Sequence, residues 1–173
     1  ELQKIVSIGS RVPSRSALDT PAPVDVFSGE EFVNQGTNDV TEILRTAVPS
    51  YNVNTQPISD APTIIRPANM RGLSPDNTLV LVNGKRRHRG SVISFLGGGI
   101  SDGAQGADVS VIPSLALSRV EILRDGASSQ YGSDAIAGVI NFQLREDSSG
   151  GTVEAVYGST YEGDGDNYRI AGN

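Results

Sequence analysis

The spacing of apolar and polar positions predicts two short helices near the N-terminus. In the first, Ser28 and Glu31 have the three-residue spacing of a capping box, in which each residue satisfies a backbone amide of the other. In the second, apolar residues recur on one helical face, at Val40, Ile43, Leu44 and Ala47. Pro49 ends this helix because proline cannot continue the backbone hydrogen-bond pattern.

Four further runs predict the strands of a small sheet. They are residues 24–26, 78–82, 120–124 and 139–144. Residues 78–82 are apolar at nearly every position, so we expect an inner strand that is covered on both faces. The Asn83-Gly84 pair that follows predicts a tight hairpin turn. Long Gly- and Pro-rich loops separate these elements, so we predict an α+β fold: a small mixed β-sheet with short helices and long loops.

The two ends of the chain have different patterns. The first eleven residues alternate weakly and have no hairpin partner, which predicts a lone extended segment, and a Pro/Ser-rich linker follows. Near the C-terminus, Val153, Ala155 and Tyr157 alternate with their neighbours, and a turn-rich stretch leads to a second strand, which predicts an unclosed β-hairpin. We therefore divide the chain into residues 1–11, 12–147 and 148–173.

Composition narrows the class of protein. The 173 residues correspond to about one domain, and 14 Lys and Arg against 20 Asp and Glu give a net charge of −6, which argues against a nucleic-acid partner. There is no cysteine, so disulfides and thiolate metal sites are excluded. No apolar run approaches the roughly 18–20 residues of a membrane-spanning helix. The chain begins at Glu1 without a signal peptide, so we expect a mature or trimmed fragment.

Candidate catalytic and metal motifs are incomplete. His88 is the only histidine, it lies in a basic run, and the Gly-x-Ser-x-Gly motif of one hydrolase class is absent. Gly97–Gly99 is not followed by the Lys-Ser/Thr of a phosphate-binding loop. The acidic residues between 162 and 167 lack the glycine and the terminal glutamate of a calcium loop. We expect no enzymatic activity, no metal and no cofactor, and a hydrolase using His88 is the weaker alternative.

Two charge features call for partners. Residues 85–89 read Lys-Arg-Arg-His-Arg, which is either a solvated hairpin edge or a ligand-facing loop. Arg71 and Arg124 each end a short apolar strand before a glycine turn, so each guanidinium is expected to be partly buried and to need a carboxylate. No obvious internal carboxylate serves both, which favours a partner on another surface.

Taken in order, these motifs resemble the N-terminal plug domain of TonB-dependent outer-membrane receptors. The residues that carry the resemblance are Pro23–Glu30, Ile43–Pro49, Met70–Leu73, Thr78–Gly84, Ile112–Gly126 and Gln130–Asn141. The resemblance covers residues 1–147, and it implies a plug lodged inside a β-barrel that the C-terminal part of the receptor forms. Residues 152–173 resemble the first hairpin of that barrel. Because this piece alone cannot close a barrel, the resemblance implies a soluble fragment.

The resemblance also implies two sets of partners. An N-terminal segment, the TonB box, pairs as an added strand with the C-terminal domain of TonB. Its place here is taken by Lys4, Ile5, Val6, Ser7 and Ile8. Arg71 and Arg124 match the two plug arginines that pair with barrel glutamates in the family.

The function implied is energised uptake of a scarce ligand, such as an iron–siderophore complex, across the Gram-negative outer membrane, with the plug facing the periplasm. The loops at residues 52–62 and 87–108 are expected to face the ligand. The candidate contacts are Gln56, Arg87, His88, Arg89, Ser91 and Phe95. The alternative is a soluble periplasmic binding or signalling module that uses the same loops without a barrel.

Overall fold

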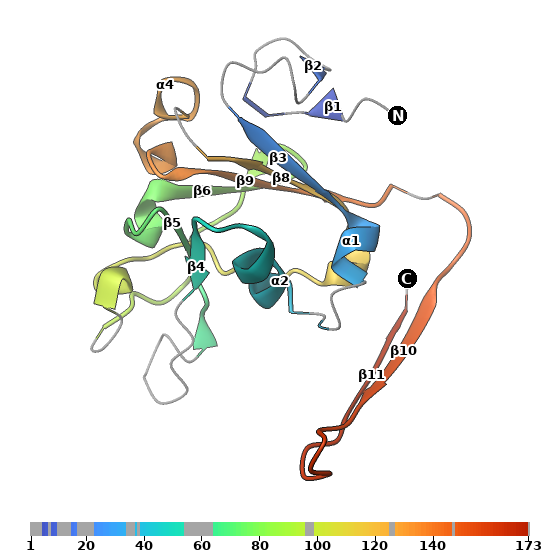
Figure 1. Cartoon of the computed structure of the whole chain (residues 1–173). Coiled ribbons are helices and arrows are strands. Elements are labelled where there is room, and N and C mark those ends of the chain that lie inside the picture. The colour runs from blue at the N-terminus through green and yellow to red at the C-terminus, as the bar shows by residue number, and fades with distance from the viewer. Residues whose placement is uncertain are drawn as a thin grey trace.

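A five-stranded sheet forms the centre of the computed structural model (Figure 1). The structure describes residues 5–6, 8–9, 15–16, 23–33, 37, 39–53, 64–95, 99–124, 127–146 and 148–172. In chain order the five strands are β3 (Val24–Ser28), β6 (Thr78–Val82), β7 (Lys85–Arg86), β8 (Leu117–Leu123) and β9 (Gly138–Leu144). Across the sheet their order is β3-β8-β9-β6-β7.

The sheet is mixed, which confirms the predicted α+β class. Strands β6 and β9 are parallel, whereas β3, β8 and β7 pair antiparallel with their neighbours. Strand β6 lies between β9 and β7, and its residues 78–81 are buried, as its apolar run predicted. Both faces of the sheet are therefore covered over its inner strands.

The Asn83-Gly84 turn forms as predicted. Both residues have positive φ, 49° for Asn83 and 74° for Gly84, which matches the backbone of a two-residue hairpin turn. The Oδ1 atom of Asn83 accepts a hydrogen bond of 2.8 Å from the amide of Leu144. The turn is thus tied to the end of β9 as well as closing β6 onto β7.

One strand carries a buried carboxylate. Glu121 in β8 is 0% exposed, and its carboxylate accepts hydrogen bonds from Arg119 Nε at 2.9 Å and from Asn141 Nδ2 at 3.1 Å. Asn141 lies directly opposite on β9 and accepts a 3.0 Å hydrogen bond from the amide of Gly84. A buried charge is tolerated only when it is paired in this way.

Two α-helices cover one face of the sheet. Helix α1 (Gly29–Val33) begins with the predicted capping box: the Ser28 amide donates to Glu31 and the Glu31 amide donates to the Ser28 hydroxyl. Helix α2 (Val40–Ala47) is capped by Asp39, whose carboxylate accepts from the Thr41 amide. Helix α1 therefore starts directly after the predicted capping residue Ser28, and helix α2 ends before Pro49, as the pattern predicted.

The main core lies between these helices and the sheet. A second small sheet, β4 (Tyr51–Val53) with β5 (Ala68–Met70), completes the cover, although residues 51–53 were predicted to be loop. The buried side chains that meet here include Phe32, Ile43, Leu44, Met70, Val80, Leu117, Val120, Ile122, Ile140 and Phe142. Tyr51 and Val53 are buried and Asn52 is exposed, which is the alternation of a strand. Three residues are too short a stretch for this alternation to predict a strand from the sequence.

The opposite face of the sheet carries a smaller core. It contains Ile8, Val24, Leu79, Leu81, Leu123, Ala127, Ala135 and Val139. Helix α4 (Ser128–Tyr131) and the strands β1 (Ile5–Val6) and β2 (Arg15–Ser16) lie on this side (Figure 1). Four single 3-10 turns complete the described elements: η2 (Pro75–Asn77), η3 (Gly99–Ser101), η4 (Ser114–Ala116) and η5 (Ser133–Ala135).

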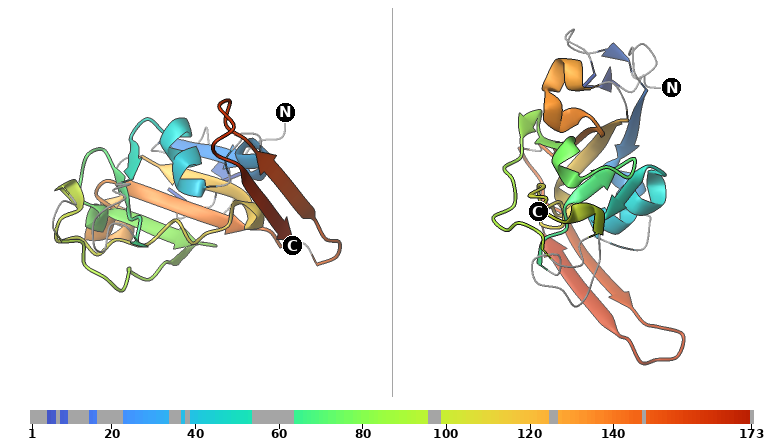
Figure 2. Two further views of the ribbon diagram at one scale, coloured as in Figure 1. Left: turned by 90° about the horizontal axis from the view of Figure 1, so that it is seen from below. Right: turned by 90° about the vertical axis from the view of Figure 1, so that its left-hand side faces the viewer.

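The predicted C-terminal hairpin forms and projects from the sheet (Figures 1 and 2). Strands β10 (Val153–Gly158) and β11 (Asn167–Gly172) pair antiparallel over six residue pairs. Within the described part of the chain, α2 is the longest helix with eight residues, and none has the length and apolar character needed to span a membrane.

Gly29, at the start of α1, gives a test of how tightly the helix packs on the sheet. A Cβ atom at Gly29 lies only 2.5 Å from the carbonyl oxygen of Leu117, so alanine forces the helix away from β8. We predict that Gly29→Ala lowers the free energy of unfolding by about 2 kcal/mol, measured by urea denaturation. Gly172→Ala is the control, since its nearest heavy atom is 3.9 Å away. Equal stability of the two variants contradicts the packing described.

Candidate functional site

The N-terminal segment is paired, which corrects the prediction of a lone extended strand. Residues Ile5 and Val6 of β1 pair antiparallel with Ser16 and Arg15 of β2. Strand β2 comes from the Pro/Ser-rich stretch that was predicted to be a linker only. Of the five predicted TonB-box residues, Lys4 and Ser7 lie outside the described residues, and Ile5, Val6 and Ile8 lie within them.

Ile8 anchors this segment to the body of the protein. Its side chain is 1% exposed and lies in the smaller core, against the face of the sheet opposite α1 and α2. The next residue, Gly9, has φ of 79°, and its amide donates a long hydrogen bond of 3.4 Å to the hydroxyl of Tyr131 in α4. Burial of one isoleucine is worth about 1.5–3 kcal/mol, so Ile8 contributes substantially to holding the described part of this segment against the sheet.

The basic run is attached to the same part of the protein. Arg86 in β7 forms an ion pair with Asp134 of η5, and it also donates a hydrogen bond to the carbonyl oxygen of Tyr131. Both contacts come from one guanidinium group. Strand β7, η5 and α4 are therefore held together, and α4 in turn contacts the N-terminal segment through Tyr131.

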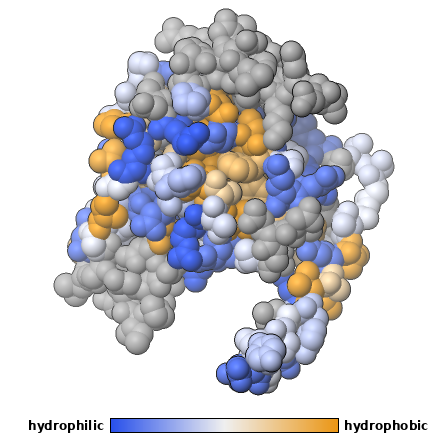
Figure 3. Space-filling model, viewed as in Figure 1, coloured by the Kyte–Doolittle hydropathy of each residue, from blue (hydrophilic) through white to orange (hydrophobic). Residues whose placement is uncertain are grey.

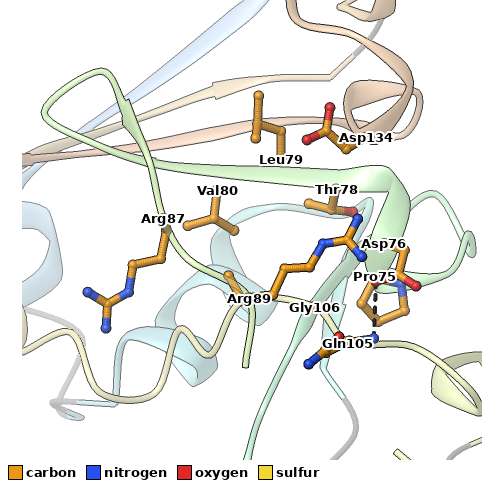
Figure 4. A pocket seen from close by; sticks show the side chains of 11 residues that line it. Pro75, Asp76, Thr78, Leu79, Val80, Arg87, Arg89, Gln105, Gly106 and Asp134 are labelled. Atoms are coloured by element: carbon orange, nitrogen blue, oxygen red, sulfur yellow. Dashed lines mark hydrogen bonds between the residues drawn. The ribbon is translucent and has the colours of Figure 1, made fainter. Parts of the chain in front are cut away.

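Two other arginines of the run line a small cavity beside β6. The cavity has a volume of about 40 Å³, enough for a few water molecules. Its lining includes Pro75, Asp76, Thr78, Leu79, Arg87, Arg89, Gln105, Gly106 and Asp134. Figure 4 shows the guanidinium of Arg89 directed toward Thr78 and Asp76, whereas that of Arg87 points away.

The polar groups that line this cavity differ in whether they form hydrogen bonds or ion pairs. The Thr78 hydroxyl is buried and has no hydrogen-bond partner among the described residues. Asp76 accepts a 3.1 Å hydrogen bond from the amide of Gln105, and Asp134 is paired with Arg86. The free hydroxyl and the nearby Arg89 make this a polar pocket suited to water or to a small polar group.

The remaining predicted contact residues are spread along the segment that follows. His88, Ser91 and Phe95 are exposed, and Gln56 lies outside the described residues. The structure thus places Arg87 and Arg89 at one cavity and Phe95 farther along the chain. Among the described residues, no three His, Asp or Glu side chains converge as metal ligands do.

Arg124 has an internal partner that sequence reasoning missed. Its Nε atom lies 2.7 Å from Oδ2 of Asp25 in β3, and its Nη2 atom donates to Oδ1 at 2.9 Å. Asp25 lies one position along β3 from Val24, which pairs with Leu123, so strand register brings the two charges together. The Arg124 side chain is still 39% exposed.

Arg71 has an unusual backbone. Its φ is 58°, in the left-handed region that non-glycine residues rarely adopt, and its amide donates a 2.7 Å hydrogen bond to the carbonyl oxygen of Ser50. The residue is exposed at the turn after β5, which corrects the prediction of a partly buried Arg71. The backbone of this turn therefore fixes the position from which the Arg71 side chain extends into solvent.

Several acidic residues lie around the buried phenol of Tyr51. Burial raises the pKa of Tyr51, and the negative charges of Asp39, Glu42 and Asp108 raise it further. The phenol hydroxyl has no hydrogen-bond partner among the described residues. Arg66 offsets part of the negative charge, since its Nη1 atom lies 2.8 Å from Asp39.

The family comparison gives one match that covers most of the chain. A family model described as the TonB-dependent receptor plug domain matches residues 16–139.

Relatives agree with this match. The chain is 30% identical over 143 residues to the ferric enterobactin receptor PirA of Pseudomonas aeruginosa, covering 80% of this chain and 19% of the relative. It is 31% identical over 132 residues to the ferrienterobactin receptor of Escherichia coli K12, covering 76% and 17%. The chain thus spans about a fifth of the length of these curated relatives. The structure of the siderophore receptor PirA from Acinetobacter baumannii superposes with a TM-score of 0.63 at 25% identity, over 86% of this chain and 21% of that one.

Tyr51 provides a test of the electrostatics. Because its folded-state pKa is raised, the unfolded phenol ionises first, and the free energy of unfolding falls as pH rises above about 10. We predict that Tyr51→Phe removes the part of the decrease in the free energy of unfolding at high pH that is due to Tyr51. At neutral pH we expect the same free energy of unfolding as in the wild type, or an increase of up to about 1 kcal/mol. Urea denaturation from pH 7 to 11 measures both effects, with Tyr161→Phe, a fully exposed site, as control. A loss above 1 kcal/mol at pH 7 contradicts an unpartnered hydroxyl.

Proposed function

This chain belongs to the TonB-dependent receptor plug domain family, and we propose that it is the plug of an outer-membrane receptor that takes up an iron–siderophore complex or a similar small ligand. The observation that carries the proposal is the family match over residues 16–139, together with relatives that are named as receptors for ferric enterobactin. In this role the chain makes and breaks no covalent bond. It blocks a passage and moves when a ligand and an energy source act together.

The C-terminal hairpin supports a barrel around the plug. Tyr157 pairs with Tyr168 across the hairpin, and Ala155 pairs with Ile170, so these side chains share one face. Tyr168 is 84% exposed and Ile170 is 77% exposed, and orange apolar side chains are visible on the hairpin in Figure 3. A row of exposed apolar and aromatic side chains at a period of two is typical of a membrane-barrel strand. The alternative of a free periplasmic module gives this hairpin no role.

The N-terminal segment is proposed to recruit TonB. Strand addition needs a free backbone edge, and β1 already uses one edge for β2. The buried Ile8 holds the segment against the sheet at the same time. Residues 4–8 therefore become fully available to a partner only after Ile8 leaves its core, and we propose that this stored state is the resting state.

The two predicted plug–barrel arginines are proposed to keep that role. Arg71 leaves the surface from a constrained backbone and is exposed. Arg124 can pair with a second carboxylate, because Asp25 binds one side of its guanidinium while more than a third of the side chain stays accessible. A barrel glutamate is then a second acceptor for Arg124.

Capture by the TonB C-terminal domain tests the stored segment. We predict that Ile8→Ser raises the fraction of the chain captured by immobilised TonB about tenfold at limiting TonB, because the apolar anchor is lost. Deletion of residues 3–9 abolishes capture. Ile64→Ser, at a side chain that is 76% exposed, is the matched control and leaves capture unchanged. Capture that survives the deletion overturns the assignment of the TonB box, and reduced capture of Ile8→Ser shows that Ile8 is a direct contact of TonB.

A further inference from the structure

The Asn83-Gly84 turn combines a chemically labile sequence with an exposed position. It is the one Asn-Gly pair among the 173 residues, and both of its residues are exposed. In such a pair the backbone nitrogen of glycine can attack the asparagine carboxamide, because glycine has no Cβ atom to hinder the approach. Water reaches this turn from solvent, so burial does not protect the carboxamide. Any protection has to come from the hydrogen bonds of the turn.

The reaction is deamidation through a cyclic imide, and water is its only co-reactant. The Gly84 nitrogen loses its proton and bonds to Cγ of Asn83, and the Cγ–Nδ2 bond breaks, so that Nδ2 leaves as ammonia with that proton. Water then opens the imide. Cleavage of the new N–Cγ bond gives aspartate, and cleavage of the original peptide bond gives isoaspartate, in which the main chain runs through Cγ. The first step requires the nitrogen to lie close to Cγ in the correct orientation.

Three hydrogen bonds hold the reacting groups against β9. The Gly84 amide donates to Oδ1 of Asn141 at 3.0 Å. The Asn83 carboxamide accepts from the Leu144 amide at 2.8 Å, and the Asn83 amide donates to the carbonyl oxygen of Phe142 at 2.8 Å. The attacking nitrogen therefore keeps its proton in a hydrogen bond, and the carboxamide is held in one orientation by the end of a strand.

The acceptor for the Gly84 amide is itself fixed in the sheet. Asn141 is 0% exposed, and its Nδ2 atom donates to Glu121, which lies opposite it in the β8–β9 register. Its Oδ1 atom therefore stays at the Gly84 amide for as long as β9 keeps its place. The hydrogen bond from Leu144 polarises the Asn83 carbonyl and by itself favours attack. The contact with Asn141 decides the direction, because no attack occurs while the Gly84 proton is held.

We propose that Asn83 is a deamidation site that the folded sheet keeps unreactive, and that it reacts when residues 141–144 of β9 separate from the turn. The proposal is independent of the proposed function. Local separation of this kind requires less free energy than unfolding of the whole domain. The amount of modified residue at position 83 is thus a chemical record of how often this corner of the sheet opens.

The two products differ in their effect on the turn. Aspartate at position 83 keeps an oxygen that accepts from the Leu144 amide. Isoaspartate adds one carbon atom to the main chain of a two-residue turn, which no longer fits the pairing of Val82 with Lys85. The next residue, Arg86, is then displaced from its ion pair with Asp134. Formation of isoaspartate is therefore a one-way change that releases β7 from the rest of the sheet.

Peptide mapping by liquid chromatography and mass spectrometry tests the proposal in the complete protein that contains this chain. The protein is incubated in mildly alkaline buffer, and aspartate and isoaspartate formed at position 83 are compared with those formed in a synthetic peptide of residues 78–89. We expect the reaction to be about tenfold slower in the protein, or slower still, because the Gly84 amide is bound there. Equal rates overturn the proposal, and so does a peptide that does not deamidate.

Asn141→Ser tests the local cause, since the shorter side chain does not reach the Gly84 amide. We expect it to raise the rate at Asn83 about fivefold or more. Val139→Ala is the matched control, because it weakens the smaller core at the other end of β9, away from the turn. We expect it to change the rate less than twofold. An equal increase in both variants means that global stability protects Asn83, which overturns the proposal.

Hydrogen exchange of the wild-type protein gives a second readout that does not depend on the folding of Asn141→Ser. We expect the Gly84 amide to exchange about tenfold more slowly than in the peptide, or more slowly still, because it is exposed yet bound to Asn141. Exchange at the rate of the peptide shows that the contact does not hold the Gly84 proton, and it overturns the proposal.

Discussion

The pairing of β8 with β9 is the constraint on which the rest of the structure depends. It brings the carboxylate of Glu121 into a position with no solvent contact, where Arg119 and Asn141 must satisfy it. Because Asn141 also accepts from the Gly84 amide, the register of β8 on β9 fixes the turn after β6. A slip of one residue turns every side chain of a strand to the other face, and here it leaves a buried charge without partners. The sheet therefore has one arrangement that satisfies both its apolar and its polar residues.

This sheet separates two regions with different tasks. One face packs against α1, α2 and the β4–β5 pair. The other face holds Ile8 and α4 in a much smaller core. Arg86 connects the edge of the sheet to η5 and α4, so the cavity beside β6 and the N-terminal segment contact one structural unit. The larger core forms the main body of the fold, and the smaller core contains the Ile8 side chain of the N-terminal segment.

Local sequence signals predicted the local structure well. The capping box at Ser28, the helical spacing from Val40 and the Asn83-Gly84 turn each depend on residues that are close along the chain, and each is present in the structure. Apart from the short strand β4, the misses are non-local. Pairing of β1 with β2, burial of Ile8 and the ion pair of Arg124 with Asp25, 99 residues apart, depend on which strands become neighbours. No pattern within a short window specifies a neighbour, so the family resemblance, which is a property of the whole chain, predicted the fold more fully than the residues did one by one.

The strand order has a consequence for the order in which parts of the chain fold. Among the described residues, strand β3 (residues 24–28) pairs in the sheet with β8, at residues 117–123, and the inner edge of β6 pairs with β9. The β4–β5 and β6–β7 pairs are close along the chain and can form early, whereas β3 and β6 gain their central partners only when residues 117–144 are present. The five-stranded sheet therefore closes late, after the pairs that are local in sequence, once both β8 and β9 are present.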